Sequence, residues 1–188
     1  MTAMCDVAFL LLTFFILTSS MTQKEPVQVA TPSSISEIKI PETNIMTILV
    51  SMDGKIFFGI DGQDKREELL GKVANTYHLT FTKAEIKRFS VINSFGVPVE
   101  KLKLFIGMEP EQRDKKGVQE GMPIDSLNNQ FKSWASLARE INPKITVAIK
   151  ADQGTPYPII KRVMDTLVEI KANNFNLITS LEEAPTNL

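Results

Sequence analysis

The sequence predicts a single N-terminal transmembrane helix followed by a small α/β (α+β) domain that contains a β-hairpin and a C-terminal βαβ unit. Three observations support this fold class: an apolar run near the N-terminus, an Asp-Gly step between two β-rich segments, and a strand–helix–strand pattern near the C-terminus. They divide the chain into a helix over 1–21, a linker over 22–44 and a domain over 45–188.

Composition narrows the possible functions. The chain has 21 basic and 22 acidic residues and no basic stripe, so nucleic acid is not an expected partner. Cys5 is the only cysteine, which excludes an internal disulfide. The single histidine, His78, has no cysteine or histidine neighbour at metal-ligand spacing. We therefore expect no metal site and no cofactor.

The apolar run covers residues 3–21, which as a helix span roughly 28 Å, about the thickness of a hydrocarbon core. A cleaved signal peptide would need a basic start, and no Lys or Arg precedes Lys24. A buried core helix is a poor fit because Phe9 to Leu17 is apolar almost all round. A membrane span is the best interpretation.

Asp6 interrupts this run, and a carboxylate at the centre of a membrane helix costs about 2.5–3.5 kcal/mol. Thr2, Asp6, Thr13 and Ser20 fall within about 60° of one another on a helix, forming one polar stripe. We interpret Asp6 as a proton-coupling residue and Thr13 as its helper. The alternative, an Asp6 that merely lies at the membrane interface, stays open.

The linker contains one alternating segment, Glu37 to Pro41. Ile38 and Ile40 on one side of an extended chain, followed by Pro41, could add as a strand to a sheet edge. A linker that is merely apolar in places explains the same pattern.

The first half of the domain begins with a hairpin. Ile45 to Met52 and Lys55 to Ile60 are β-rich and flank Asp53-Gly54, a strong turn signal. Asp64 is expected to cap the next helix. The apolar face of that helix is predicted to be Leu69, Leu70, Val73 and Tyr77.

The middle of the domain gives weaker signals. Thr82 is expected to cap a short helix that runs to Phe89, within a loop-rich insertion at about 78–123. A further helix should begin at Asp125 or Ser126 and end at Asn142-Pro143. Its apolar face is predicted to be Leu127, Phe131, Trp134, Ala138 and Ile141, with Trp134 in the core.

The C-terminal part predicts a strand over 145–150, a turn, a helix from Tyr157 or Pro158, and a last strand over 175–179. Lys150 and Asp152 lie at the end of the first strand. No Ser/His, Cys/His or paired-carboxylate arrangement accompanies them, so we do not expect an enzyme. Asp152 is better interpreted as a turn or capping residue.

Three segments together resemble the ExbD/TolR family of biopolymer transport proteins. Residues 1–12, with Met4-Cys5-Asp6-Val7 leading into a Leu/Phe-rich span, resemble its membrane signature. Residues 147–179 resemble its C-terminal end through Lys150-Ala151-Asp152, Pro156-Tyr157-Pro158 and Val163-Met164-Asp165. Residues 38–41 resemble a short motif ahead of the folded domain. The insertion has no counterpart in the family pattern.

The resemblance implies a subunit that couples the proton motive force to transport, anchored by one span in a bacterial inner membrane. The N-terminus would be cytoplasmic and the domain periplasmic. Implied partners are an ExbB/TolQ-like polytopic subunit, a TonB/TolA-like protein and a second copy of the chain. Implied contact residues are Lys150, Asp152, Tyr157, Ile160, Val163 and Leu167. Within the family the resemblance favours the ExbD-like subtype. A rival interpretation is a membrane-tethered, TolR-like module that binds peptidoglycan or a protein.

Overall fold

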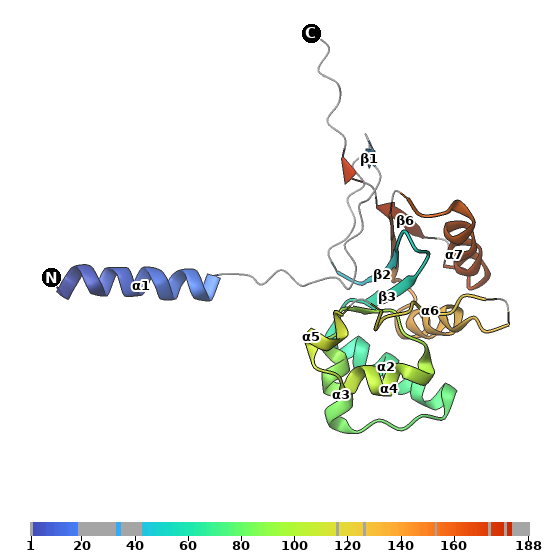
Figure 1. The fold of residues 1–188 in the computed structure, drawn as a ribbon, viewed down its shortest axis with the longest axis horizontal. Helices are drawn as coiled ribbons and strands as arrows, with labels where there is room; N and C mark the ends of the chain where they lie inside the picture. The colour runs from blue at the N-terminus through green and yellow to red at the C-terminus, as the bar shows by residue number, and fades with distance from the viewer. Residues whose placement is uncertain are drawn as a thin grey trace, which may run out of the picture.

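The computed structural model describes residues 2–18, 33–34, 43–115, 117–125, 127–152, 154–172, 174–178 and 180–181 (Figure 1). Its elements, in chain order, are α1 (Thr2–Thr18), β1 (Ser33–Ser34), β2 (Ile45–Val50), β3 (Ile56–Ile60), α2 (Gln63–Tyr77), α3 (Lys83–Ser90), β4 (Ser94–Phe95), α4 (Val99–Gly107), α5 (Pro110–Arg113), α6 (Gln130–Ile141), β5 (Thr146–Ala151), α7 (Tyr157–Glu169), β6 (Phe175–Ile178) and β7 (Ser180–Leu181).

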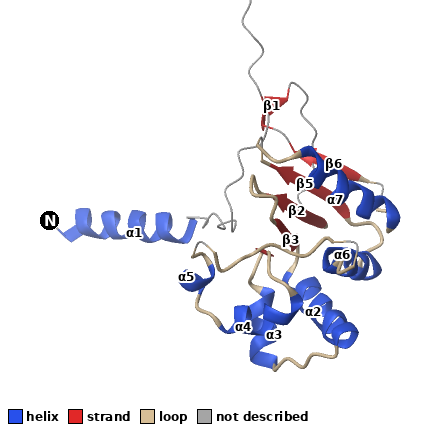
Figure 2. Ribbon diagram, turned by 45° about the vertical axis from the view of Figure 1, so that its right-hand side comes forward, coloured by secondary structure: helices blue, strands red, loops and turns tan. Residues whose placement is uncertain are grey.

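A five-stranded mixed sheet in the order β4-β3-β2-β5-β6 forms the centre of the domain (Figure 2). β2 and β3 are antiparallel and joined by a tight turn in which Gly54 has a φ of 77°. This conformation favours glycine. The antiparallel pairing and the turn together confirm the predicted Asp-Gly hairpin. β5 is parallel to both β2 and β6, with α7 as the crossover between β5 and β6. The predicted C-terminal βαβ unit is therefore also confirmed.

The hydrophobic core lies between the sheet and the helices. Alternate residues of β2, namely Met46, Ile48 and Val50, point into the same buried cluster as residues of α2, α6 and α7. The helix α6 contacts both α2 and α7. One layer of helices thus covers one face of the sheet, as expected for a small α+β domain.

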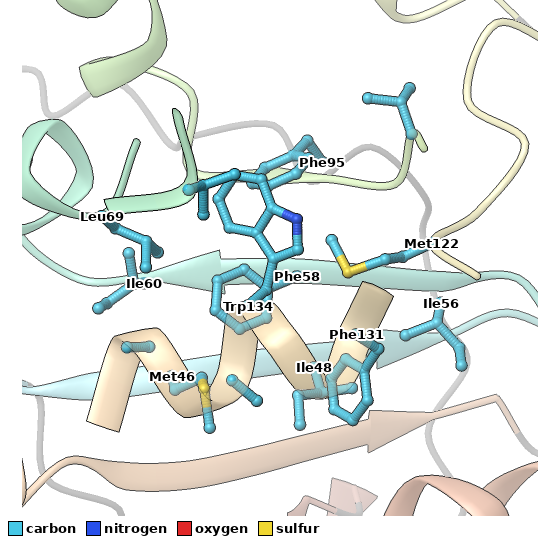
Figure 3. Close-up of a cluster of buried hydrophobic side chains, with 14 of the residues drawn as sticks. Met46, Ile48, Ile56, Phe58, Ile60, Leu69, Phe95, Met122, Phe131 and Trp134 are labelled. Atoms are coloured by element: carbon cyan, nitrogen blue, oxygen red, sulfur yellow. The ribbon is translucent and has the colours of Figure 1, made fainter. Parts of the chain in front are cut away.

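Trp134 is the centre of an aromatic group in this core (Figure 3). Its ring lies 4.9 Å from that of Phe95, 6.0 Å from Phe58 and 6.1 Å from Phe89, measured between centroids. The Trp134 side chain is fully buried, which confirms its predicted place in the core. Its indole N–H has no hydrogen-bond partner among the described residues.

The segment 78–123 differs from its prediction. The Thr82 cap is confirmed, because its Oγ1 accepts a hydrogen bond from the Glu85 N–H while the Glu85 carboxylate accepts one from the Thr82 N–H. The expectation of a loop-rich insertion is wrong, since α3, β4, α4 and α5 all lie here. The segment also supplies core residues: Phe89, Phe95, Val97, Val99, Leu102, Phe105, Ile106 and Met122.

Two predicted helix starts are corrected. The N-cap of α2 is Gly62, with a φ of 94°, and Asp64 lies inside the first turn, where its charge still favours the helix N-terminus. The helix α6 begins at Gln130, because Asn129 rather than Asp125 or Ser126 accepts the capping hydrogen bond from a backbone N–H. Leu127 consequently lies before the helix and is fully exposed.

Gln130 connects two helices that are distant in the sequence. Its side-chain oxygen accepts a hydrogen bond from the Val99 N–H at 2.8 Å, at the start of α4. Its side-chain nitrogen donates to the Glu100 carboxylate at 2.9 Å. Gln130 is only 1% exposed, so it satisfies a buried helix end that has no side-chain cap of its own.

Candidate functional site

The helix α1 contains the first predicted site. Its large apolar side chains are all exposed, from 52% at Leu11 to 85% at Leu17. The four consecutive residues Phe14 to Leu17 point to all sides of the helix at 100° per residue. No helix among the described residues meets the combined length and apolarity required to cross a membrane.

Asp6 is an exposed carboxylate on this apolar helix. Within residues 2–18 it is the only acidic or basic side chain. Thr13 lies seven residues further on, which in a helix places it on the same side, about 10 Å along the axis. The polar stripe predicted for Asp6 and Thr13 is thus compatible with α1, whereas its last member, Ser20, lies outside the described residues.

The Thr13 hydroxyl has a defined partner. It donates within its own helix to the carbonyls of Phe9 or Leu10, at 3.0 and 2.9 Å. This leaves the lone pairs of its oxygen available to accept a hydrogen bond. Chemically, the pair offers one group that can bind and release a proton and one neutral group that can accept a hydrogen bond from water or from a protonated carboxyl.

The second predicted site lies where β5 leads into α7. The Oδ1 of Asp152 accepts a hydrogen bond from the Gly154 N–H at 3.0 Å, and the Asp152 carbonyl accepts one from the Thr155 N–H. Asp152 is therefore a turn residue, as expected. Lys150 lies on β5 close to this turn, and Tyr157 is the first residue of α7, with 67% of its surface exposed.

The sequence analysis did not single out Thr155, which holds this turn against the hairpin, and it named Gly54 only for the hairpin turn. The Thr155 hydroxyl donates to the carbonyls of Val50 or Ser51, both at 3.3 Å. A Cβ atom added at Gly54 would lie 2.3 Å from Cδ1 of Ile159 in α7. The Asp-x-Gly-Thr spacing of the turn was the signal that could have identified Thr155.

The predicted contact face of α7 is corrected in part. Val163 and Leu167 are fully buried in the core of this same chain, so they are not available to a second protein in this conformation. Ile160 is half-buried and packs against the core. An apolar stripe on an amphipathic helix shows which face is buried but not what it packs against. In α7 this face packs against the core of the same chain.

The linker motif of Ile38, Ile40 and Pro41 lies outside the described residues. Within the predicted linker the structure describes Ser33 and Ser34, together with Thr43 and Asn44. Ser33 and Ser34 form β1 and pair in parallel with Ser180 and Leu181 of β7. The linker strand β1 and the strand β7 therefore lie side by side.

His78 ends α2 in a left-handed conformation, with a φ of 55°. In the described part of the chain, no group of three His, Cys, Asp or Glu residues is arranged to hold a metal ion.

Comparison with known proteins gives one match. The family described as biopolymer transport protein ExbD/TolR matches residues 1–182, which include α1 and the folded domain. No curated protein and no solved structure matches the chain.

Proposed function

Because the chain belongs to the ExbD/TolR family of biopolymer transport proteins, we propose that it is the proton-coupling subunit of an inner-membrane motor. The motor would combine it with an ExbB/TolQ-like polytopic subunit and drive a TonB- or TolA-like protein for transport at the outer membrane. The ExbD-like subtype is preferred on the resemblance of the sequence. In this role the chain would not catalyse a chemical reaction itself.

The proposed topology has one span over residues 1–21, a cytoplasmic N-terminus, and the linker and domain in the periplasm. The apolar side chains exposed around α1 support this topology. In water, each Å² of exposed apolar surface costs about 25 cal/mol, and a membrane would remove that cost. The described helix is about 26 Å long at 1.5 Å per residue. Residues 19–21 of the proposed span lie outside the described part of the chain.

The lone carboxylate of Asp6 is the observation that carries the proposed mechanism. One proton that crosses 100 mV releases about 2.3 kcal/mol, and capturing this energy requires a titratable group in the path. The charged carboxylate is costly in lipid and the protonated form is much less so. A site that alternates between a hydrated path and a dry packing surface therefore couples protonation to movement of the helix.

The folded domain would meet its partners where β5 leads into α7. Tyr157 is exposed there, and Lys150, Asp152 and Ile160 lie on the same strand–turn–helix unit. Self-association as a dimer is proposed to use this region without Val163 and Leu167. The segment Ile38 to Pro41 is proposed to dock on a sheet edge. Amide hydrogens of residues 36–41 that exchange without protection in every energised and de-energised state would contradict this.

The test is Asp6→Asn, which keeps the size and polarity of the side chain but cannot release a proton. We expect the variant to assemble with its membrane partners at wild-type levels and to have no transport activity, measured as uptake across the outer membrane. Thr13→Val should be milder. Full activity of Asp6→Asn would reduce α1 to a tether and support the alternative of a TolR-like module that binds peptidoglycan or a protein.

A further inference from the structure

A pocket of about 220 Å³ opens in the helical region between β3 and α6. It lies between the end of α3 and the connection from α4 to α5. The lining residues are Arg88, Val91, Met108, Glu109, Pro110 and Arg113. Three of these side chains are apolar and two are guanidinium groups. Val91 is 60% exposed, so its side chain is accessible to a ligand.

Arg113 is held in place by the chain itself. Its Nε donates to the Phe105 carbonyl at 3.1 Å, and its Nη2 donates to the Ile106 carbonyl at 2.9 Å. Its guanidinium also lies over the Phe105 ring, 5.6 Å from the centroid. These contacts fix a cation at the C-terminal end of α4, so little side-chain entropy is lost when an anion binds to it.

The two arginines are close enough to affect each other. Burial lowers the pKa of Arg113 most, and the positive charge of Arg88 lowers it further, while Glu109 and Asp114 act in the opposite direction. Among the described residues, neither Arg88 nor Arg113 forms an ion pair with a carboxylate. The pocket lining therefore carries two guanidinium groups against one carboxylate, that of Glu109, and this excess of positive charge favours an anion.

The lining residues favour a carboxylate beside an aliphatic side chain over a phosphate. Val91, Met108 and Pro110 provide an apolar wall that suits an aliphatic side chain. Glu109, at the same pocket, disfavours a doubly charged phosphate more than a singly charged carboxylate. The volume is below the range of about 300–1,000 Å³ that is usual for small-molecule sites. It suits one or two residues of a peptide.

We propose that this pocket binds an acidic side chain, flanked by an aliphatic residue, from an extended segment of a partner protein. The carboxylate would lie between the guanidinium groups of Arg88 and Arg113, and the neighbouring aliphatic side chain would cover Val91 and Met108. The region 83–113 would then be a docking face of its own. The proposal does not depend on the proton-coupling role of Asp6.

The experiment measures the binding of two fluorescent peptides to the full chain in nonionic detergent micelles by anisotropy. One peptide is acetyl-Gly-Leu-Glu-Leu-Gly, and the other has glutamine in place of glutamate. We expect the glutamate peptide to bind more tightly. Arg88→Gln should weaken its binding about threefold to tenfold, the scale of a partly exposed charge pair, and leave binding of the glutamine peptide unchanged.

The matched control is Lys87→Gln, which removes a neighbouring exposed cation of α3 that does not line the pocket. It should bind both peptides like the wild type, and Val91→Asp should weaken the glutamate peptide by repulsion. Equal affinity for the two peptides, no binding of either, or an equal effect of Lys87→Gln and Arg88→Gln would overturn the proposal. Displacement of the peptide by inorganic phosphate but not by acetate would also overturn it.

Discussion

The helix α1 and the folded domain use apolar residues in opposite ways. In the domain, large side chains such as Phe58 and Trp134 are buried against one another, and the chain supplies their surroundings itself. In α1, Phe9 and its neighbours are exposed on all sides, and the only acidic group is Asp6. The folded domain is stabilised by its own packing, whereas α1 exposes its apolar side chains and, in the proposed membrane span, would be surrounded by lipid or by partner subunits.

Because of this difference, we expect substitutions in the domain and in α1 to affect different properties of the protein. Substitutions in the domain core should change the free energy of unfolding, because they remove contacts that the chain makes with itself. Substitutions in α1 should leave the stability of the domain unchanged and act on assembly or proton coupling. The single tryptophan, Trp134, lies in the domain core, so its fluorescence reports on unfolding of the domain alone.

The strongest test of the comparison is a pair of identical substitutions, Phe58→Ala and Phe9→Ala. Phe58→Ala should lower the free energy of unfolding by about 3–5 kcal/mol, the usual cost of an emptied aromatic site in a core. Phe9→Ala should change it by less than about 0.5 kcal/mol. Urea unfolding of both variants in nonionic detergent, followed by Trp134 fluorescence, gives the two values. Similar losses in both variants would mean that the two regions are not independent.

A second test concerns the polar contact inside the domain. Gln130→Ala leaves the buried Val99 N–H without its acceptor and should cost about 1–3 kcal/mol in the same unfolding experiment. The control is Gln63→Ala, because Gln63 is exposed at the start of α2 and should be close to neutral. A neutral Gln130→Ala variant would show that α4 is not held by α6.

The smallest expected effect is at the cap of α3. Thr82→Ala should cost about 1 kcal/mol through loss of the capping hydrogen bond. The hydrogen bonds from the Thr82 backbone N–H and hydroxyl lower the pKa of Glu85 from its ordinary value of 4.5. The contribution of the Glu85 carboxylate to folding stability is therefore fully present above pH 4.5, and it is lost as the pH falls through the lowered pKa. The wild type and Thr82→Ala differ in their free energy of unfolding, which urea unfolding measures. This difference should shrink as the pH falls from 4.5 through the lowered pKa of Glu85.

Local signals in the sequence predicted much of this domain. The Asp-Gly step identified the hairpin, Thr82 identified a cap, and alternation and helical period identified the βαβ unit. The register of the predicted helix around Trp134 was right, although its first turn was placed too early, because Asp125 and Ser126 are also common capping residues.

Features that depend on contacts between distant residues could not be predicted in the same way. The helix α4 has Pro98 at its N-cap and takes its acceptor from Gln130, which is 31 residues away, so no local signal marks it. The periodicity of α7 correctly placed Val163 and Leu167 on an apolar face. It could not tell whether that face meets the chain's own core or another subunit. Asp6 was singled out because a single charge in an apolar helix is visible without tertiary information, and its proton-coupling role stays a prediction.

The position of β2 has a mechanical consequence. The folded domain begins with Ile45, so the chain enters directly at an inner strand, which pairs five residues with β3 and six with β5. Tension applied from the N-terminal side pulls this strand along its own axis, across hydrogen bonds that run between strands. Both ladders then bear the load together, in shear, whereas an edge strand peeled sideways would lose its bonds one at a time. We therefore expect the domain to resist such tension better than a domain that the chain enters at an edge strand.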